Sequence, residues 1–361
     1  MKLEENYEEY GQSKKGNSML LTAVIAVSVC FALVIGLVLF LNRETLFPKQ
    51  APAQTVTEPE SSPDLDDLIS GDKIVSGDLD IWDDYMVEEE EEDSQVWYEE
   101  KPSDDDPSEG GTKTLIEYAN GSTEWVDVSP YLPQNEYDNS GFAMLNGRMA
   151  YYQDGAKLSY TGVDISKYQG YVDFNAVKRD GVDYVMIRLG QRGYSTGQLV
   201  LDDYFADNMK RANDAGIPVG VTFFSQAVSV EEAEEEADFV LQYLEGQTVR
   251  YPVVFDMQHI ANDSARVDIL TKEEKTQIAK AFLSKIEAAG YIGMIHADKP
   301  WMFTDINYSA VSNYGIWLEQ IKDLPDYPYR FQMWKYTNVG AVDGIEGSVS
   351  LSISLVDYTI K

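Results

Sequence analysis

The stretch YPVVFDMQHI, residues Tyr251 to Ile260, decides the fold. A proline lies near the start of an apolar, β-branched run that polar residues bound, which is typical of a parallel strand buried on both faces. The carboxyl ends of such strands face the ligand side of the sheet. Residues two apart on a strand point to the same side, so we expect Asp256 and Gln258 to face one cleft together.

Further apolar runs recur from residue 161 to the end and alternate with helical patterns. The predicted strands are 162–166, 184–190, 217–225, 251–257, 291–297, 314–320, 331–336 and 348–354, and the clearest predicted helices are 202–216, 229–244 and 271–290. Alternation predicts a parallel sheet, and eight strands in about 200 residues close most simply as a barrel. Because the last three strands have short connections, we expect an irregular (β/α) TIM-like barrel at 161–361 with an incomplete ring of helices.

Local signals support the helix boundaries. Thr271 and Glu274 have the spacing of a capping box at a helix start. Gly216 and Gly290 stand where helices of this length need a left-handed residue to end.

The chain from Met19 to Leu41 runs for 23 residues without a charged side chain. As a helix it is about 34 Å long, enough to cross the core of a bilayer. A cleaved signal peptide is the alternative, but the apolar stretch is long and LNRET after it contains no small-x-small cleavage site. We expect a cytoplasmic tail at 1–18, a single transmembrane helix at 19–41 and the remainder outside the cell, because long acidic segments translocate readily.

Residues 42–113 are rich in Asp, Glu, Ser and Pro, with EEEEED at Glu88–Asp93. Like charges repel and little apolar surface offsets the entropy of ordering, so we expect a disordered acidic linker. Short apolar patches such as LDIWDDYM leave open a role as docking motifs for protein partners. Residues 114–160 predict a small β annex with hairpins in TLIEYANGSTEWVDV and RMAYYQDGAKLSY, which either packs on the barrel or extends a substrate groove.

Composition excludes several classes of function. The net charge of −34 leaves no cationic surface for the phosphates of nucleic acid or for anionic lipid. The one cysteine, Cys30, lies in the apolar segment, so the chain has no internal disulfide and no Cys-based metal site. His259 and His296 are too few for a His-built zinc site. We expect no metal and no cofactor.

Polar and aromatic residues stand at the ends of successive predicted strands: Asp164, Arg188, Ser225, Gln226, Asp256, Gln258, His296, Asp298, Trp317, Trp334, Tyr336 and Ser350. Aromatic rings stack on sugar faces, and carboxylates act at a glycosidic oxygen. Each residue taken singly fits a core or turn role, but together they predict a carbohydrate cleft.

Six motifs resemble those of the glycoside hydrolase family 25 lysozymes, the Chalaropsis-type muramidases: GVDISKYQGYVDFNAVKRDGVDYVMIRLG, AGIPVGVTFFSQA, PVVFDM, GYIGMIHA, IWLEQ and MWKYTNVGAVDGIEG. The resemblance runs from about Thr161 to the end. It implies an irregular (β/α) barrel and cleavage of peptidoglycan between N-acetylmuramic acid and N-acetylglucosamine. It also implies that Asp164, Asp256 and position 258 are catalytic.

The chain departs from the family pattern at the chemical positions. The general acid of the family's Asp-x-Glu motif is Gln258 here, and a carboxylate near the C-terminus is replaced by Ser350. A tyrosine of the fifth strand is replaced by His296, and the Asn two residues on by Asp298. An amide has no acidic proton to donate to the leaving oxygen. Two substitutions at chemical positions therefore suggest a pseudoenzyme.

We therefore predict a membrane-anchored domain outside the cell that binds peptidoglycan strands with weak or absent muramidase activity. Arg188, Gln226, His296, Asp298, Trp317, Trp334, Tyr336 and Ser350 are the predicted substrate-binding residues. One alternative is an active muramidase with a relocated acid, namely Asp298, Glu319 or a protonated His296. The other is a non-enzymatic domain that binds protein partners at the cell wall.

Overall fold

The computed structural model describes residues 107–260 and 263–360. The predicted cytoplasmic tail, the predicted transmembrane helix at 19–41 and nearly all of the predicted linker lie outside these residues. Within the described part of the chain, no helix combines the length and the apolar character that a membrane crossing needs.

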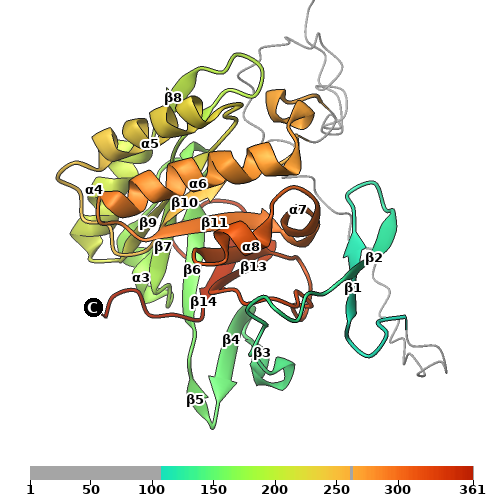
Figure 1. Cartoon of the computed structure of the whole chain (residues 1–361). Coiled ribbons are helices and arrows are strands. Elements are labelled where there is room, and N and C mark those ends of the chain that lie inside the picture. Colours follow the sequence, from blue (N-terminus) through green and yellow to red (C-terminus); the bar gives the residue numbers. More distant parts are fainter. Residues whose placement is uncertain (1–106, 261–262, 361) are drawn as a thin grey trace, which may run out of the picture. The chain divides into compact units, whose positions relative to one another are not determined.

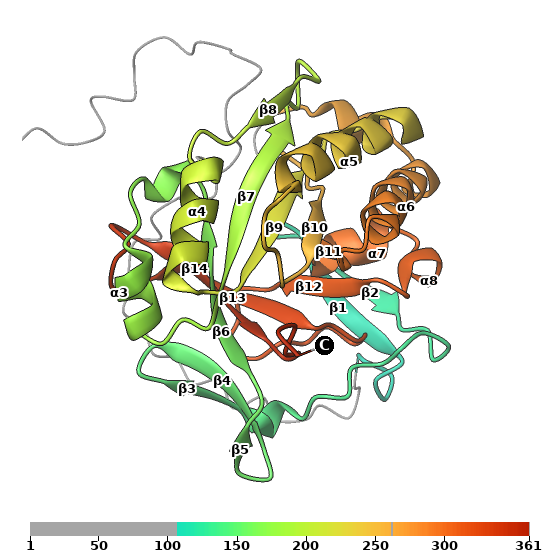
Figure 2. The same cartoon turned by 90° about the vertical axis from the view of Figure 1, so that its left-hand side faces the viewer.

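Eight strands close into a barrel in a mixed α/β fold (Figures 1 and 2). In order around the barrel they are β6 (Tyr160–Ile165), β7 (Tyr184–Arg192), β9 (Val219–Phe224), β10 (Val253–Asp256), β11 (Gly293–Asp298), β12 (Gly315–Glu319), β13 (Met333–Gly340) and β14 (Val349–Ser354). These are the eight strands that the sequence predicts. A ninth, β8 (Leu199–Leu201), pairs with the end of β7 outside the barrel.

The expectation of a parallel sheet is wrong for one strand. β14 runs antiparallel to both of its neighbours, β13 and β6. The segment between β13 and β14 contains no helix, and a parallel pair needs a long crossover, so the chain turns back directly as a hairpin.

Helices cover the outside of the barrel and pack against β7, β9, β10 and β11 (Figure 2). They are α3 (Phe174–Arg179), α4 (Phe205–Ala215), α5 (Val230–Leu244), α6 (Lys272–Ala288), α7 (Lys299–Thr304) and α8 (Tyr308–Val311), with short 3-10 turns at Asn139–Gly141, Lys167–Gln169 and Arg266–Ile269. The three longest confirm the predicted helices, and the incomplete ring is confirmed because no helix joins β12 to β13 or β13 to β14. The Thr271–Glu274 capping box and the left-handed Gly216 are also present.

Large side chains fill the barrel interior beneath the carboxyl ends of the parallel strands. Tyr184, Met186, Val254, Met294, Trp317 and Met333 form one buried cluster there. Gly162 faces the same space, where a Cβ would lie 2.1 Å from Cζ of the Tyr184 ring. The packed side chains therefore close the barrel interior beneath the carboxyl ends of the strands.

The annex consists of two separate pieces. β1 (Lys113–Glu117) and β2 (Thr123–Asp127) form the first predicted hairpin, while β4 (Arg148–Gln153) and β5 (Ala156–Lys157) form the second. A further strand, β3 (Phe142–Leu145), pairs with β4 and was not among the predicted strands. An Asn-Gly turn at Asn146, with φ of 52°, joins β3 to β4 and is the signal that could have revealed it.

Candidate functional site

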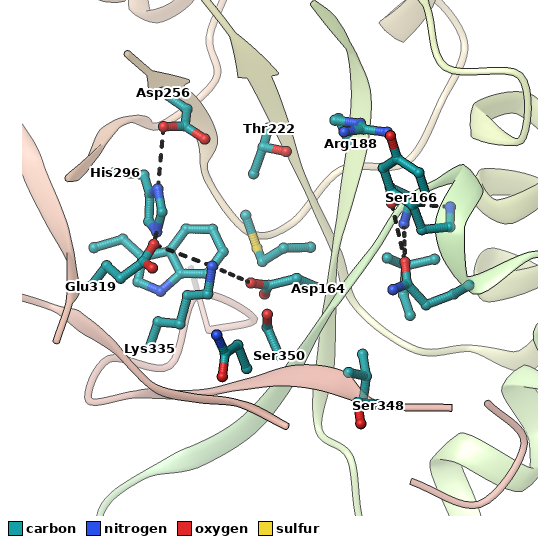
Figure 3. Close-up of a pocket in the computed structure, with 17 residues that line it drawn as sticks. Asp164, Ser166, Arg188, Thr222, Asp256, His296, Glu319, Lys335, Ser348 and Ser350 are labelled. Carbon is teal, nitrogen blue, oxygen red and sulfur yellow. Dashed lines mark hydrogen bonds and ion pairs between the residues drawn. The ribbon is translucent and has the colours of Figure 1, made fainter. Parts of the chain in front are cut away.

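Every barrel strand contributes to one pocket at the carboxyl ends of the parallel strands (Figure 3). The pocket has an empty volume of about 740 Å³, which includes solvent at its open mouth. Trp317 forms part of its lining, as predicted, and donates its indole N–H to Ser352 Oγ at 3.2 Å. The ring is 2% exposed, so it supports the pocket more than it projects into it.

Five charged side chains of alternating sign run across this pocket (Figure 3). His296 Nδ1 lies 3.3 Å from Asp256 Oδ1, and His296 Nε2 lies 3.2 Å from Glu319 Oε2. Lys335 Nζ lies 3.2 Å from Glu319 Oε2 and 3.8 Å from Asp164 Oδ2. We refer to Asp256, His296, Glu319, Lys335 and Asp164 as the charge chain.

Strand register explains why these residues meet. Asp256 on β10 is directly opposite His296 on β11, and Glu319 on β12 is directly opposite Lys335 on β13. Neighbouring strands lie about 5 Å apart, so opposite side chains on one face are in contact distance. Asp164 lies on β6, and its carboxylate joins the charge chain through Lys335 of β13.

The charge chain fixes protonation states inside the pocket. Burial acts to lower the pKa of His296, but the carboxylates of Asp256 and Glu319 outweigh it and raise the pKa to about 9. Burial acts to raise the pKa of Glu319, but Lys335 and His296 outweigh it and lower the pKa to about 2. At neutral pH the imidazolium and the Glu319 carboxylate are therefore both charged.

Asp164 differs from the other carboxylates of the chain. Burial raises its pKa to about 7, although Lys335 and His296 act in the opposite direction. Its Oδ1 atom is buried and has no hydrogen-bond partner among the described residues. Near neutral pH this group holds a proton in a substantial fraction of the molecules.

Gln258 does not line the pocket, although it follows the same strand as Asp256. Its Nε2 donates to Asp256 Oδ1 at 2.9 Å and lies 3.1 Å from His296 Nδ1. Its backbone carbonyl accepts from Nε2 of Gln226 at 3.4 Å. The amide thus orients Asp256, the first member of the charge chain, from outside the cavity.

Other predicted site residues have mixed positions. Ser350 and Arg188 line the pocket, and Arg188 is held by a buried ion pair with Asp202 in which Nη2 and Oδ2 are 2.9 Å apart. Gln226 is fully buried beside Gln258 and does not line the pocket, and neither does the fully buried Ser225. Asp298 caps α7 by accepting from Trp301 N–H at 2.7 Å and also lies outside the lining.

Trp334 and Tyr336 do not lie in the pocket, against the expectation of a substrate contact. The Trp334 ring packs edge-on against Phe142 of the annex with 5.4 Å between centroids, and Tyr336 Oη accepts from Met149 N–H at 3.2 Å. Alternation along β13 places Lys335 inside and its two neighbours outside. Lys335 was not among the predicted site residues, although strict alternation from the interior Met333 indicates that it faces the pocket.

The described residues also bear on metal binding and on the annex. Residues 107–260 and 263–360 contain no group of three His, Cys, Asp or Glu side chains placed to hold a metal ion. No annex residue lines the pocket. The annex therefore packs on the barrel and does not extend this cavity.

Comparison with known proteins places this geometry in a family. The model of the glycosyl hydrolases family 25 matches residues 163–345, about half of the chain. The matched segment includes Asp164, Asp256, Gln258 and His296 and ends before Ser350.

Curated relatives also match part of the sequence. The chain is 27% identical over 165 residues to the "D-alanyl-L-alanine endopeptidase" of Streptococcus phage B30, covering 41% of this chain and 35% of that protein. It is 24% identical over 191 residues to the "Autolytic lysozyme" of Clostridium acetobutylicum, covering 53% of this chain and 54% of that protein. The chain thus spans about a third to a half of the length of these relatives.

Among solved structures, the modular autolysin LytC of Streptococcus pneumoniae is similar at a TM-score of 0.50 and 22% identity, over 67% of this chain and 56% of that one. This likeness shows a shared fold. The family match over half of the sequence goes further, and the chain belongs to the glycosyl hydrolases family 25.

Proposed function

We propose that the barrel acts on peptidoglycan as a glycan-binding domain with weak or absent muramidase activity. Membership of the family and the "Autolytic lysozyme" relative support peptidoglycan as the ligand. The observation that carries the proposal is Gln258, an amide at the position where the family has its general acid, bonded to Asp256 at 2.9 Å.

Glycoside hydrolysis requires a proton on the leaving oxygen as the bond breaks. General acid help is typically worth 10² to 10⁴-fold, roughly 3 to 5 kcal/mol of barrier. One of the predicted substitute acids is poorly suited, because the Glu319 carboxylate is held ionised by Lys335 and His296. The protonated His296 is buried between two carboxylates that hold its proton.

A second candidate function is slow hydrolysis with Asp164 as the relocated acid. The raised pKa of about 7 and the unpartnered Oδ1 favour it, since an acid with a pKa near the working pH is the effective kind. Such activity would increase as the pH falls through about 7 and would be lost in Asp164→Asn.

The test measures two properties of the protein with purified peptidoglycan: co-sedimentation and the release of new reducing ends. We expect co-sedimentation without appreciable release. Rapid release would contradict the proposal, and a pH-dependent release that Asp164→Asn abolishes would establish the second candidate. If the protein neither co-sediments with peptidoglycan nor releases reducing ends, that result would instead favour a domain that binds protein partners.

We also propose that the segment at 19–41 anchors the protein in the cell membrane, with its N-terminus in the cytoplasm and the barrel facing the cell wall. The uncharged run of 23 residues supports this location. Extraction of membranes with alkaline carbonate should leave the protein in the membrane fraction, and protease added to intact protoplasts should digest the barrel. Release by carbonate would contradict the anchor.

A further inference from the structure

His296 is buried between two carboxylates and next to position 258. Its ring is 2% exposed and stacks obliquely on Trp317, with 4.5 Å between ring centroids. Each ring nitrogen lies within 3.3 Å of a carboxylate oxygen, from Asp256 on one side and Glu319 on the other. A buried imidazole between two carboxylates is most stable with both nitrogens protonated.

The same imidazolium is next to position 258. Its Nδ1 lies 3.1 Å from Gln258 Nε2, while Asp256 Oδ1 lies 2.9 Å from that same nitrogen. A carboxyl group at this position would therefore lie about equally close to one positive and one negative charge. The two Coulomb interactions oppose each other and largely cancel, since their distances are similar.

We propose that His296 is a positioning residue that sets the charge state of position 258, so that the site would lack a proton donor even with a glutamate there. Next to Asp256 alone, a second carboxyl would keep its proton, because two carboxylates in contact cannot both ionise. With the imidazolium beside them, both carboxyls ionise. This inference rests on the proposed function and explains which further residue maintains it.

The carboxylates around His296 act to keep its proton. Asp256 and Glu319 contact the ring from β10 and β12, while Asp164 from β6 lies further along the charge chain. Lys335 is the one opposing cation in the chain, and it is paired with Glu319 at 3.2 Å. Removing the imidazole charge therefore changes the balance at position 258 most directly.

The test compares three variants, each also carrying Ser350→Asp and Gln258→Glu. The first keeps His296, the second adds the neutral, polar His296→Gln, and the third adds the charge-retaining His296→Lys. We expect release of reducing ends from peptidoglycan to be on the order of 10²-fold faster in the His296→Gln variant than in the other two. Its activity should also extend about one pH unit or more further toward alkaline pH.

Equal activity in the first two variants, or in the last two, would overturn the inference. If the His296→Gln variant fails to unfold cooperatively on heating, the first variant still decides the matter by NMR titration of the carboxyl at position 258. We expect that group to titrate near the ordinary glutamate pKa of about 4.3. A pKa in the neutral range would contradict the inference. The proposed function itself fails on a separate result, rapid lysis by the unaltered protein.

Discussion

At the scale of single residues, predicting the pocket requires both the type of each side chain and the direction in which it points. The sequence correctly placed Asp164, Asp256, His296 and Ser350 at strand ends around one pocket. It could not give the contacts of the charge chain, because these depend on strand register and on burial. It also assigned the outward Trp334 to the cleft, since an aromatic side chain on a strand can fill a core as well as bind a sugar.

The stability of the folded protein should depend on His296 in a pH-dependent way. Its pKa is raised from 6.5 to about 9 in the folded state, so the stabilisation is fully present below about pH 6.5 and is lost as the pH rises through about 9. In urea unfolding, the difference between the wild type and His296→Gln should shrink from pH 6 to pH 10, by at most about 3 kcal/mol. A difference that does not change with pH would show that the imidazole is neutral.

The Asp164 carboxylate should destabilise the folded protein, in contrast to the His296 imidazolium. Because burial raises its pKa from 3.8 to about 7, folding is penalised progressively as the pH rises from about 4 to 7. Asp164→Asn should therefore unfold at a higher temperature than the wild type at pH 8, and the gain should disappear at pH 4. Destabilisation at pH 8 would mean that the ion pair with Lys335 outweighs the burial of the carboxylate.

At the scale of elements, local signals predicted strands and helices well and their pairing less well. Apolar β-branched runs identified all eight barrel strands. A strand that is buried on both faces is apolar along its length, so it can be recognised without knowing which strands it pairs with. The antiparallel direction of β14 depends on the connection before it, and the short β3 has only its Asn-Gly turn as a signal.

The capping box of α6 offers a test at this scale. The Thr271 hydroxyl accepts from Glu274 N–H at 3.3 Å, while the Glu274 carboxylate accepts from Thr271 N–H at 2.8 Å. Thr271→Ala should lower the free energy of unfolding by about 1 kcal/mol without changing co-sedimentation with peptidoglycan. A loss of binding would indicate that α6 positions the pocket as well as covering the barrel.

At the scale of the whole molecule, the annex is part of the described fold and not of the pocket. Phe142 is 8% exposed and its ring contacts Trp334 of the barrel. Phe142→Ala should cost about 3 kcal/mol of stability, as buried aromatic truncations do, and leave peptidoglycan binding in place. Loss of binding at unchanged stability would instead assign the annex to the substrate groove.

We propose that the amide at position 258 leaves this family 25 barrel without effective proton donation. The most direct measurement is the rate at which the unaltered protein releases reducing ends from purified peptidoglycan, compared with its Asp256→Asn variant as a baseline. We expect rates within about tenfold of each other, because general acid help worth 10² to 10⁴-fold is missing. A rate more than about a hundredfold above the baseline at neutral pH would contradict it.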